Sequence, residues 1–217
     1  MTHAPSHEAS ERGTLFIVSA PSGAGKTSLV SALLKKMSGI AVSISHTTRD
    51  QRPGEVDGVN YHFVSMEKFQ QMVADEAFFE YAHVFDRMYG SSKQEVESRL
   101  NSGEDVILEI DWQGARQVRE KMAEARSIFI LPPSQEALYN RLSQRGQDSE
   151  ETIARRMQEA VSESSHYDEY DYVIFNDDFE QALKEFESIV LSERAAMPRA
   201  GLSHQKLLDA LLSRVTS

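Results

Sequence analysis

Short apolar runs alternate along this chain with segments in which apolar residues recur every three or four positions. The runs have the character of strands buried on both faces, and they lie at 15–18, 41–44, 106–110, 127–131 and 172–175. The helical patterns lie at about 26–37, 93–101, 112–124, 135–144, 151–167 and 179–196. Strands that alternate with helices predict an α/β fold, in which a parallel sheet is flanked by helices.

The alternation breaks between residues 45 and 91. This segment is rich in Thr, Arg, Gly, Tyr and Phe, and period-two patterns at 59–64 and 78–85 surround a short helical pattern at about 67–74. We interpret it as an inserted, partly antiparallel subdomain of mixed α/β structure.

The two ends of the chain differ from the rest. Residues 1–12 are polar and lack the apolar centre of a signal peptide, so we expect a flexible tail. Residues 202–217 predict an amphipathic helix with one apolar stripe, formed by Leu207, Leu208, Leu211, Leu212 and Val215. We expect this stripe to pack on protein, either on its own subunit or on a second copy in a homo-oligomer.

Composition narrows the class of protein. A chain of 217 residues with 40% hydrophobic and 26% charged residues fits one globular domain of ordinary size, with insertions. The apolar runs are too short to cross a membrane, and a net charge of −11 argues against non-specific binding to nucleic acid. The absence of cysteine is typical of a cytoplasmic protein.

The loop after the first apolar run carries the clearest chemistry. It reads Ala20-Pro21-Ser22-Gly23-Ala24-Gly25-Lys26-Thr27-Ser28, close to the phosphate-loop pattern G-x-x-x-x-G-K-S/T. Its glycines allow the backbone N–H groups to point into a concavity that fits a polyphosphate, and the following helix turns its positive dipole end toward the anion. Lys26 supplies a charge for the β and γ phosphates and Thr27 a hydroxyl for Mg²⁺.

One position departs from this pattern. Ala20 stands where the first glycine belongs, but that position is the exit of the strand, where an alanine can be extended. The alternative interpretation of 15–29 is an ordinary strand-loop-helix turn.

Several longer motifs are more specific in combination. The GMP-binding segment of guanylate kinases closely resembles SHTTRDQRPGE at 45–55, GVNYHF at 58–63 and YGS at 89–91. The phosphate loop, fourth-strand region and lid approach of the same family resemble SAPSGAGKTSL at 19–29, LEIDWQGA at 108–115 and IFILPPS at 128–134. The resemblance covers about residues 13–196. It implies phosphoryl transfer from ATP, bound with Mg²⁺ as MgATP, to GMP or dGMP.

The resemblance also implies a division of the chain. Residues 13–201 would form a guanylate kinase-like domain with a P-loop NTPase core. The core would comprise 13–44, 92–140 and 168–201, the GMP-binding insert 45–91, and a small helical lid about 141–167.

By resemblance, four residues of the insert form a clamp for the GMP phosphate. Arg49 and Arg52 can offer planar forks that meet phosphate oxygens two at a time. Tyr61 and Tyr89 add neutral donors, which hold the phosphate without removing its nucleophilicity. Arg49 is also expected to be catalytic. The alternative is that the two arginines belong to a solvated loop.

The family's readers of guanine match four further positions. Glu80 and Asp111 are candidates to accept the N1–H and exocyclic amine of the base, and Ser45 and Ser91 match the hydroxyls that complete recognition. Two alternatives remain: an acidic residue at the end of an apolar strand often serves the Mg²⁺ shell, as Asp111 would, and Glu80 alone could be a solvated strand residue.

The predicted lid supplies the remaining catalytic candidates. Arg141 and Arg145, four apart, share a helix face, and by resemblance they and Arg156 neutralise charge on the transferring phosphoryl group, together with Lys26. Arg155 is an alternative to Arg156. The lid arginines could instead form ion pairs with Glu150, Glu151 or Glu159.

A turn after the last strand completes the predicted ATP site. Asn176 with Asp177 resembles the family's turn on the adenine side.

Two other functions are compatible with the fold. Guanylate-kinase-like domains also occur as catalytically inactive modules that bind phosphopeptides or proteins, and a P-loop kinase of another phosphorylated metabolite would look similar. The intact Gly23, Gly25, Lys26 and Thr27 favour an enzyme.

Overall fold

A computed structural model describes residues 12–84, 86–143, 149–196 and 204–213. The predicted tail, apart from Arg12, therefore lies outside the described residues. So do Phe85, Arg145 and Val215.

The core of the molecule is a five-stranded parallel sheet, as the apolar runs predict. Its strands, in spatial order, are β2 (Ile40–Val42), β7 (Asp105–Glu109), β1 (Leu15–Ser19), β8 (Arg126–Leu131) and β9 (Tyr172–Phe175). Because β1 is central, the carboxyl ends of β7 and β8 flank the loop that follows it. Ligands of α/β sheets bind at such an edge.

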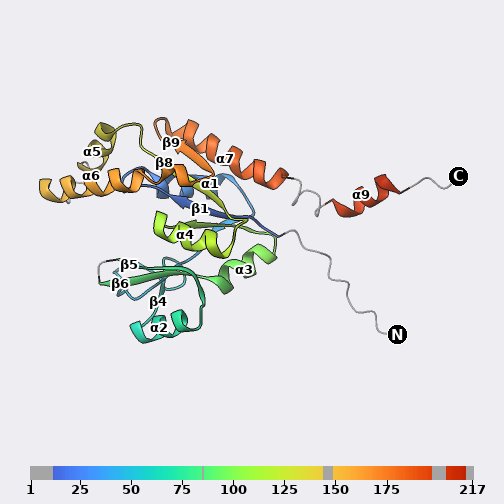
Figure 1. The fold of residues 1–217 in the computed structure, drawn as a ribbon, viewed down its shortest axis with the longest axis horizontal. Coiled ribbons are helices and arrows are strands. Elements are labelled where there is room, and N and C mark those ends of the chain that lie inside the picture. The colour runs from blue at the N-terminus through green and yellow to red at the C-terminus, as the bar shows by residue number, and fades with distance from the viewer. Residues whose placement is uncertain (1–11, 85, 144–148, 197–203, 214–217) are drawn as a thin grey trace.

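Both faces of the sheet are covered, which explains why the strands are apolar throughout. Phe16 and Val18 of β1 pack with α1 (Lys26–Lys36) and α7 (Phe179–Ala195), whereas Leu15 and Ile17 pack with α3 (Lys93–Asn101) and α4 (Trp112–Lys121). The layered arrangement is visible in Figure 1, where α4 lies between the core sheet and a second, smaller sheet.

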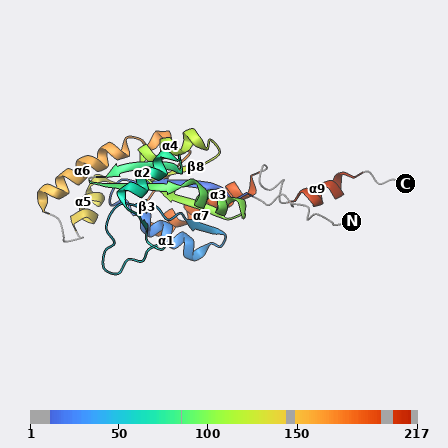
Figure 2. The ribbon, with the colours of Figure 1, turned by 90° about the horizontal axis from the view of Figure 1, so that it is seen from below.

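The second sheet belongs to the segment between β2 and α3 and is partly antiparallel, as predicted. Its strands, in spatial order, are β4 (His62–Phe63), β3 (His46–Thr47), β6 (Arg87–Ser92) and β5 (Phe78–Val84). Helix α2 (Met66–Ala74) packs on it through Phe69, whose ring stacks on Phe78 at 4.7 Å. The strand predicted at 59–64 is wrong in length, since β4 has two residues and Tyr61 before it forms only an isolated bridge with Asp57. Figure 2 views the molecule from the side of this sheet.

Two helices at one end of the molecule form a small cluster of their own. Helices α5 (Gln135–Ser143) and α6 (Glu150–Ser164) pack through four buried side chains: Leu138, Leu142, Ile153 and Ala160. The helix predicted to continue to 167 ends earlier, and a 3-10 turn follows, η1 (Tyr167–Glu169). The chain turns there because the ring of His166 stacks on Trp112 at 3.7 Å and Tyr170 is buried in the core.

Other predicted boundaries also shift. Helix α4 ends at Lys121 instead of 124, because Met122 and Ala125 are buried in the core as the chain turns toward β8. Strand β2 is three residues long and starts one residue earlier than predicted.

The C-terminal amphipathic helix forms as α9 (Gln205–Leu212), within the predicted range 202–217. Leu207, Leu211 and Leu212 are 54%, 70% and 79% exposed, and α9 stands clear of the other elements in both views (Figure 1, Figure 2). Of the two alternatives left open by the sequence, packing on the same subunit is not seen in the described residues, and packing on a second copy stays a prediction. Within the described ranges, none of the helices is long and apolar enough to span a membrane.

Candidate functional site

The loop between β1 and α1 has the backbone that a phosphate cradle requires. Gly23 and Gly25 lie in the left-handed region, with φ of 89° and 97°, which other residues rarely adopt. Ala20 is not in that region, so an alanine meets no strain where the usual pattern has a glycine. The departure from the motif is therefore without structural consequence.

Side chains from the far end of the chain hold this loop in place. The amide of Asn176, after β9, donates to the Ala24 carbonyl at 2.7 Å. Arg141 on α5 donates to the same carbonyl at 3.3 Å and to the Asn176 carbonyl at 2.9 Å. A Cβ at position 25 would lie 2.3 Å from Asn176 Nδ2, so the close approach requires Gly25. Asn176 and Arg141, predicted to contact nucleotide, thus contact the backbone of the loop.

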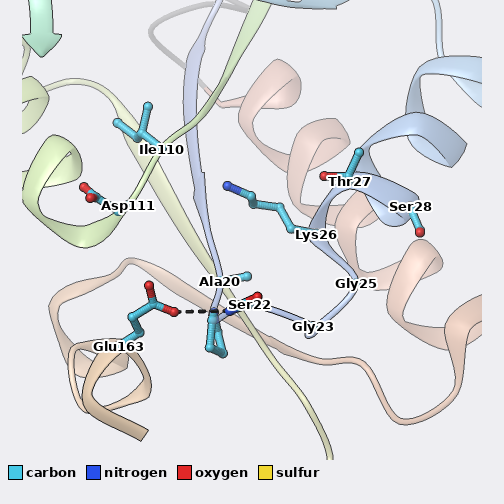
Figure 3. A pocket seen from close by; sticks show the side chains of 11 residues that line it. Ala20, Ser22, Gly23, Gly25, Lys26, Thr27, Ser28, Ile110, Asp111 and Glu163 are labelled. Atoms are coloured by element: carbon cyan, nitrogen blue, oxygen red, sulfur yellow. Dashed lines mark hydrogen bonds between the residues drawn. The ribbon is translucent and has the colours of Figure 1, made fainter. Parts of the chain in front are cut away.

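A cavity of about 360 Å³ opens beside the loop (Figure 3). Its lining comprises Ala20, Pro21, Ser22, Gly23, Gly25, Lys26, Thr27, Ser28, Ile110, Asp111 and Glu163. The Lys26 side chain projects from the start of α1 toward the side where Ile110 and Asp111 lie. Burial lowers the pKa of the Lys26 ammonium, while the carboxylates of Glu109, Asp111 and Glu163 act in the opposite direction.

Two acidic residues of this site were not predicted. Glu109, at the end of β7, accepts a hydrogen bond from the Thr27 hydroxyl at 3.2 Å. Glu163, on α6, accepts one from the backbone N–H of Ser22 at 3.2 Å, and burial raises the pKa of its carboxyl. A charged residue within the apolar run 106–110 was a signal for Glu109. Glu163 has no such signal, since 141 positions separate it from Ser22.

A second cavity, of about 290 Å³, lies between the core and the smaller sheet. It is lined by Lys26, Ser45, Tyr61, Glu80, Ala82, Tyr89, Glu109, Ile110 and Asp111. Five predicted GMP-binding residues from distant parts of the chain thus meet around one space. The two cavities share Lys26, Ile110 and Asp111, so groups bound in them would meet beside Lys26.

Glu80 is the most buried acidic group of this second cavity. It is 5% exposed, and the Ser91 hydroxyl donates to its Oε1 at 2.6 Å. Burial, opposed by the hydrogen bond from Ser91, raises the pKa of Glu80 to about 7. The alternative that Glu80 is a solvated strand residue is therefore wrong.

Asp111 is positioned by the helix that it begins. It is the N-cap of α4 and accepts from the Gly114 N–H at 2.7 Å. A Cβ at Gly114 would lie 3.1 Å from Glu80 Oε2 and 3.4 Å from Asp111 Oδ1, so both carboxylates approach the first turn of α4.

Arg49 is held beside the tyrosines by Glu55, which was not predicted as a site residue. Arg49 Nη2 lies 2.7 Å from Glu55 Oε1, its side chain is 13% exposed, and its guanidinium lies 5.4 Å from the ring centre of Tyr61. The hydrogen bond to Glu55 raises the pKa of Arg49. Arg52 is exposed and contributes its backbone N–H to Glu55 Oε2 at 2.8 Å.

The α6 arginines face different surroundings. Arg155 is exposed and lies 3.6 Å from Glu159, which is one of the ion pairs that the sequence allows for the lid arginines. Arg156 is half-buried and stands seven positions before Glu163, about two helical turns away on the same face.

Comparisons with known proteins show the family of this chain. The family model described as guanylate kinase matches residues 12–193. A guanylate kinase from Chromohalobacter salexigens is 60% identical over 204 residues, which are 94% of this chain and 95% of the relative. One from Saccharophagus degradans is 61% identical over 201 residues, 93% of this chain and 98% of the relative.

A solved structure shows the same architecture. The crystal structure of guanylate kinase from Anaplasma phagocytophilum has a TM-score of 0.71 at 33% identity, covering 94% of this chain and 97% of that one. The fold, the phosphate loop and these relatives lead to one conclusion: the chain belongs to the guanylate kinase family.

Proposed function

We propose that this protein transfers the γ-phosphoryl group of ATP to GMP, giving ADP and GDP, and that dGMP is also a substrate. The observation that carries the proposal is the pair of cavities that share Lys26, Ile110 and Asp111. One is lined by a phosphate loop, and the other by a buried carboxylate, two phenols and a serine. The relatives named guanylate kinase support the same reaction.

The first cavity suits the triphosphate of ATP. The loop offers backbone N–H groups at the start of α1, and Lys26 adds a positive charge that faces both cavities. Thr27 Oγ1 and Glu109 Oε2, 3.2 Å apart, are hard oxygen ligands that fit Mg²⁺. In the described part of the chain no three His or acidic side chains form a metal cluster, so phosphate oxygens would complete the shell. Bound there, Mg²⁺ would offset charge on the phosphates.

The second cavity suits guanine. An ionised Glu80 can accept both the N1–H and the exocyclic amine, whereas the N1 of adenine is an acceptor and would face a carboxylate. Asp111 approaches the same turn of α4 as Glu80 does. Glu109, in contrast, accepts a hydrogen bond from the Thr27 hydroxyl. These contacts favour assigning Asp111 to the base and Glu109 to the metal.

The phosphate of GMP would lie among Arg49, Tyr61 and Tyr89. The rings of Tyr61 and Tyr89 meet edge to face at 5.9 Å, and Arg49 lies against Tyr61. These groups combine one charged fork with neutral donors, so the phosphate is held while its oxygens stay nucleophilic. The exposed guanidinium of Arg52 would add further hydrogen-bond donors to this phosphate.

The reaction needs no general base, because the attacking oxygen of GMP is already anionic. The protein contributes positioning and charge neutralisation. Lys26 of the core and Arg49 of the insert supply positive charge to the transferred phosphoryl group. Arg145 and Arg156 supply it from the lid, for which we propose bounds of about 141–167. Arg141 acts through the loop that it braces. The lid would also exclude water.

Measured ADP release with purified protein tests this function. With ATP as donor, we expect rapid turnover with GMP and dGMP, and little with AMP, UMP or ribose phosphates. Lys26→Ala serves as the inactive control. If no acceptor supports turnover, the binding-module alternative is correct. If a ribose phosphate or pyrimidine nucleotide is preferred, the assignment of Glu80 and Asp111 to guanine is wrong.

A further inference from the structure

Strand β5 contains a bulge immediately before Glu80. Phe78 pairs with Ser92 and Glu80 with Ser91, so Phe79 is an extra residue on β5. The bulge directs three successive side chains to different places. Phe78 stacks on Phe69 within the insert, Phe79 joins the core cluster, and Glu80 lines the guanine cavity.

One face of α4 contacts this bulge at three points spaced as i, i+3 and i+7. Lys121 Nζ donates to the carbonyls of Phe78 and Phe79, at 3.2 and 2.6 Å. Gln117 exchanges two hydrogen bonds of 3.2 Å with the backbone of Tyr81. Gly114 leaves room for the Glu80 carboxylate.

These contacts fix the strand on both sides of Glu80. A bulge disrupts the ladder locally, so backbone groups beside it need other partners, and Lys121 and Gln117 provide them. A slip of one residue in β5 would turn Glu80 away from the cavity, because side chains alternate between the faces of a strand. The N-cap of the same helix is Asp111, so α4 sets the positions of both carboxylates.

We propose that Lys121 and Gln117 are positioning residues for guanine recognition, which hold the bulge of β5 so that Glu80 and Asp111 face the base together. The inference rests on the proposed function. It assigns the base selectivity of the site to a helix face that does not line the cavity.

The test uses Lys121→Met, Lys121→Arg and, as a matched control, Lys184→Met on the exposed surface of α7. Substrates are GMP and IMP, whose base lacks the exocyclic amine. Lys121→Met should raise KM for GMP by about ten- to a hundredfold, since a misplacement near 1 Å can cost up to about a hundredfold. The preference for GMP over IMP should fall, while KM for ATP stays within about twofold. Lys121→Arg, which can reach both carbonyls, should restore most of the preference.

The pH profile of KM for GMP provides a second measurement. Loss of the packing of the Lys121 side chain alone would not shift this profile along the pH axis. The charged groups near Glu80 are Asp111 and Lys121 on α4, with Lys26 and Glu109 in the same cavity, and the Ser91 hydroxyl faces it from β6. The Lys121 cation lowers the pKa of Glu80, so Lys121→Met should move the weakening of GMP binding to a higher pH. Lys121→Arg should not.

If Lys121→Met leaves the GMP to IMP preference and the pH profile unchanged, the inference is wrong. Equal losses with GMP, IMP and ATP would also overturn it, because they indicate general disruption. Should Lys121→Met not fold, Gln117→Leu tests the same expectation, since it removes both bonds to Tyr81. A wild-type enzyme that does not phosphorylate GMP at all would instead overturn the proposed function.

Discussion

The two cavities at the centre of this molecule are built in different ways. The phosphate-loop cavity is lined largely by residues of one loop, 20–23 and 25–28, of which Gly23 and Gly25 can present only backbone. The cavity that we assign to guanine is lined by side chains from β5, β6, the end of β7, the start of α1 and the loops beside β3, β4 and α4. Its shape depends on how an inserted sheet docks on a helix.

The difference predicts different sensitivities to mutation. A backbone-lined site depends on the loop conformation and on the few side chains that brace or charge it, such as Lys26 and Asn176. A site lined by side chains from several elements depends on each of them and on the register of β5. The mutations below separate the two cases, and they run from the largest expected effect to the smallest.

Lys26→Ala should lower kcat by about a hundred- to a thousandfold, because no other side chain brings a positive charge to the point where the described cavities meet. The melting temperature should change little, since Lys26 belongs to neither hydrophobic cluster of the core. Steady-state kinetics and thermal unfolding measure the two quantities. Turnover near that of the wild type in a folded variant would mean that the loop does not bind the transferred phosphate.

Acid should weaken GMP binding through Glu80. Its pKa is raised to about 7, so the carboxylate that we assign to the guanine donors is ionised above this pH and lost as pH falls through it. KM for GMP should rise about tenfold between pH 8 and pH 6.

The phosphate of GMP also titrates near this range, so Glu80→Gln is the control. In this variant the titration of Glu80 no longer contributes to the pH dependence of KM, whereas the titration of the GMP phosphate still does. Identical profiles for the two proteins would show that Glu80 does not control GMP binding.

Asn176→Ala should raise KM for ATP by about three- to tenfold, because it removes the hydrogen bond to the Ala24 carbonyl that braces the loop. KM for GMP should stay nearly constant. The exposed Glu180 in the first turn of α7, changed to Ala, is the matched control. An equal change in both KM values would show that Asn176 supports the whole core and not the loop alone.

Glu163→Gln should have the smallest effect, a decrease of about twofold in KM for ATP. The Glu163 carboxylate accepts a hydrogen bond from the Ser22 N–H of the loop, and it adds negative charge where phosphates would bind. Glu159→Gln, one turn earlier on α6, is the control. A rise in KM for ATP would mean that Glu163 supports the loop and does not compete with phosphate.

The two cavities also differ in how far the sequence predicts them. The loop was predictable because its residues are contiguous and the role of each follows from its own chemistry. The glycines allow the left-handed backbone, and Lys26 and Thr27 offer a charge and a hydroxyl. The parallel sheet followed from apolar runs whose alternate residues fill both faces. For the guanine cavity, family resemblance located Ser45, Tyr61, Glu80, Tyr89 and Asp111, whereas periodicity gave no reason to place them together.

What the sequence did not predict depends on contacts between distant residues. The bulge at Phe79 and its partner Lys121 are far apart in the chain, and neither carries a motif. Glu55 and Glu163 are acidic residues in polar segments, which are usually solvated. The end of α6 depends on the stacking of His166 on Trp112, a contact that no helical pattern encodes.

The most direct test of how the guanine cavity works is calorimetric titration of the wild type and Glu80→Gln with GMP and, separately, with ADP. Glutamine places a donor where guanine presents donors, which should cost ~1 to 3 kcal/mol in GMP binding. The Kd for GMP should therefore rise about tenfold or more, while that for ADP stays within about twofold. The variant should be at least as heat-stable as the wild type, since the ionised form of Glu80 is disfavoured by burial. Unchanged GMP binding, or equal losses of GMP and ADP binding, would contradict the assignment of Glu80 to the base.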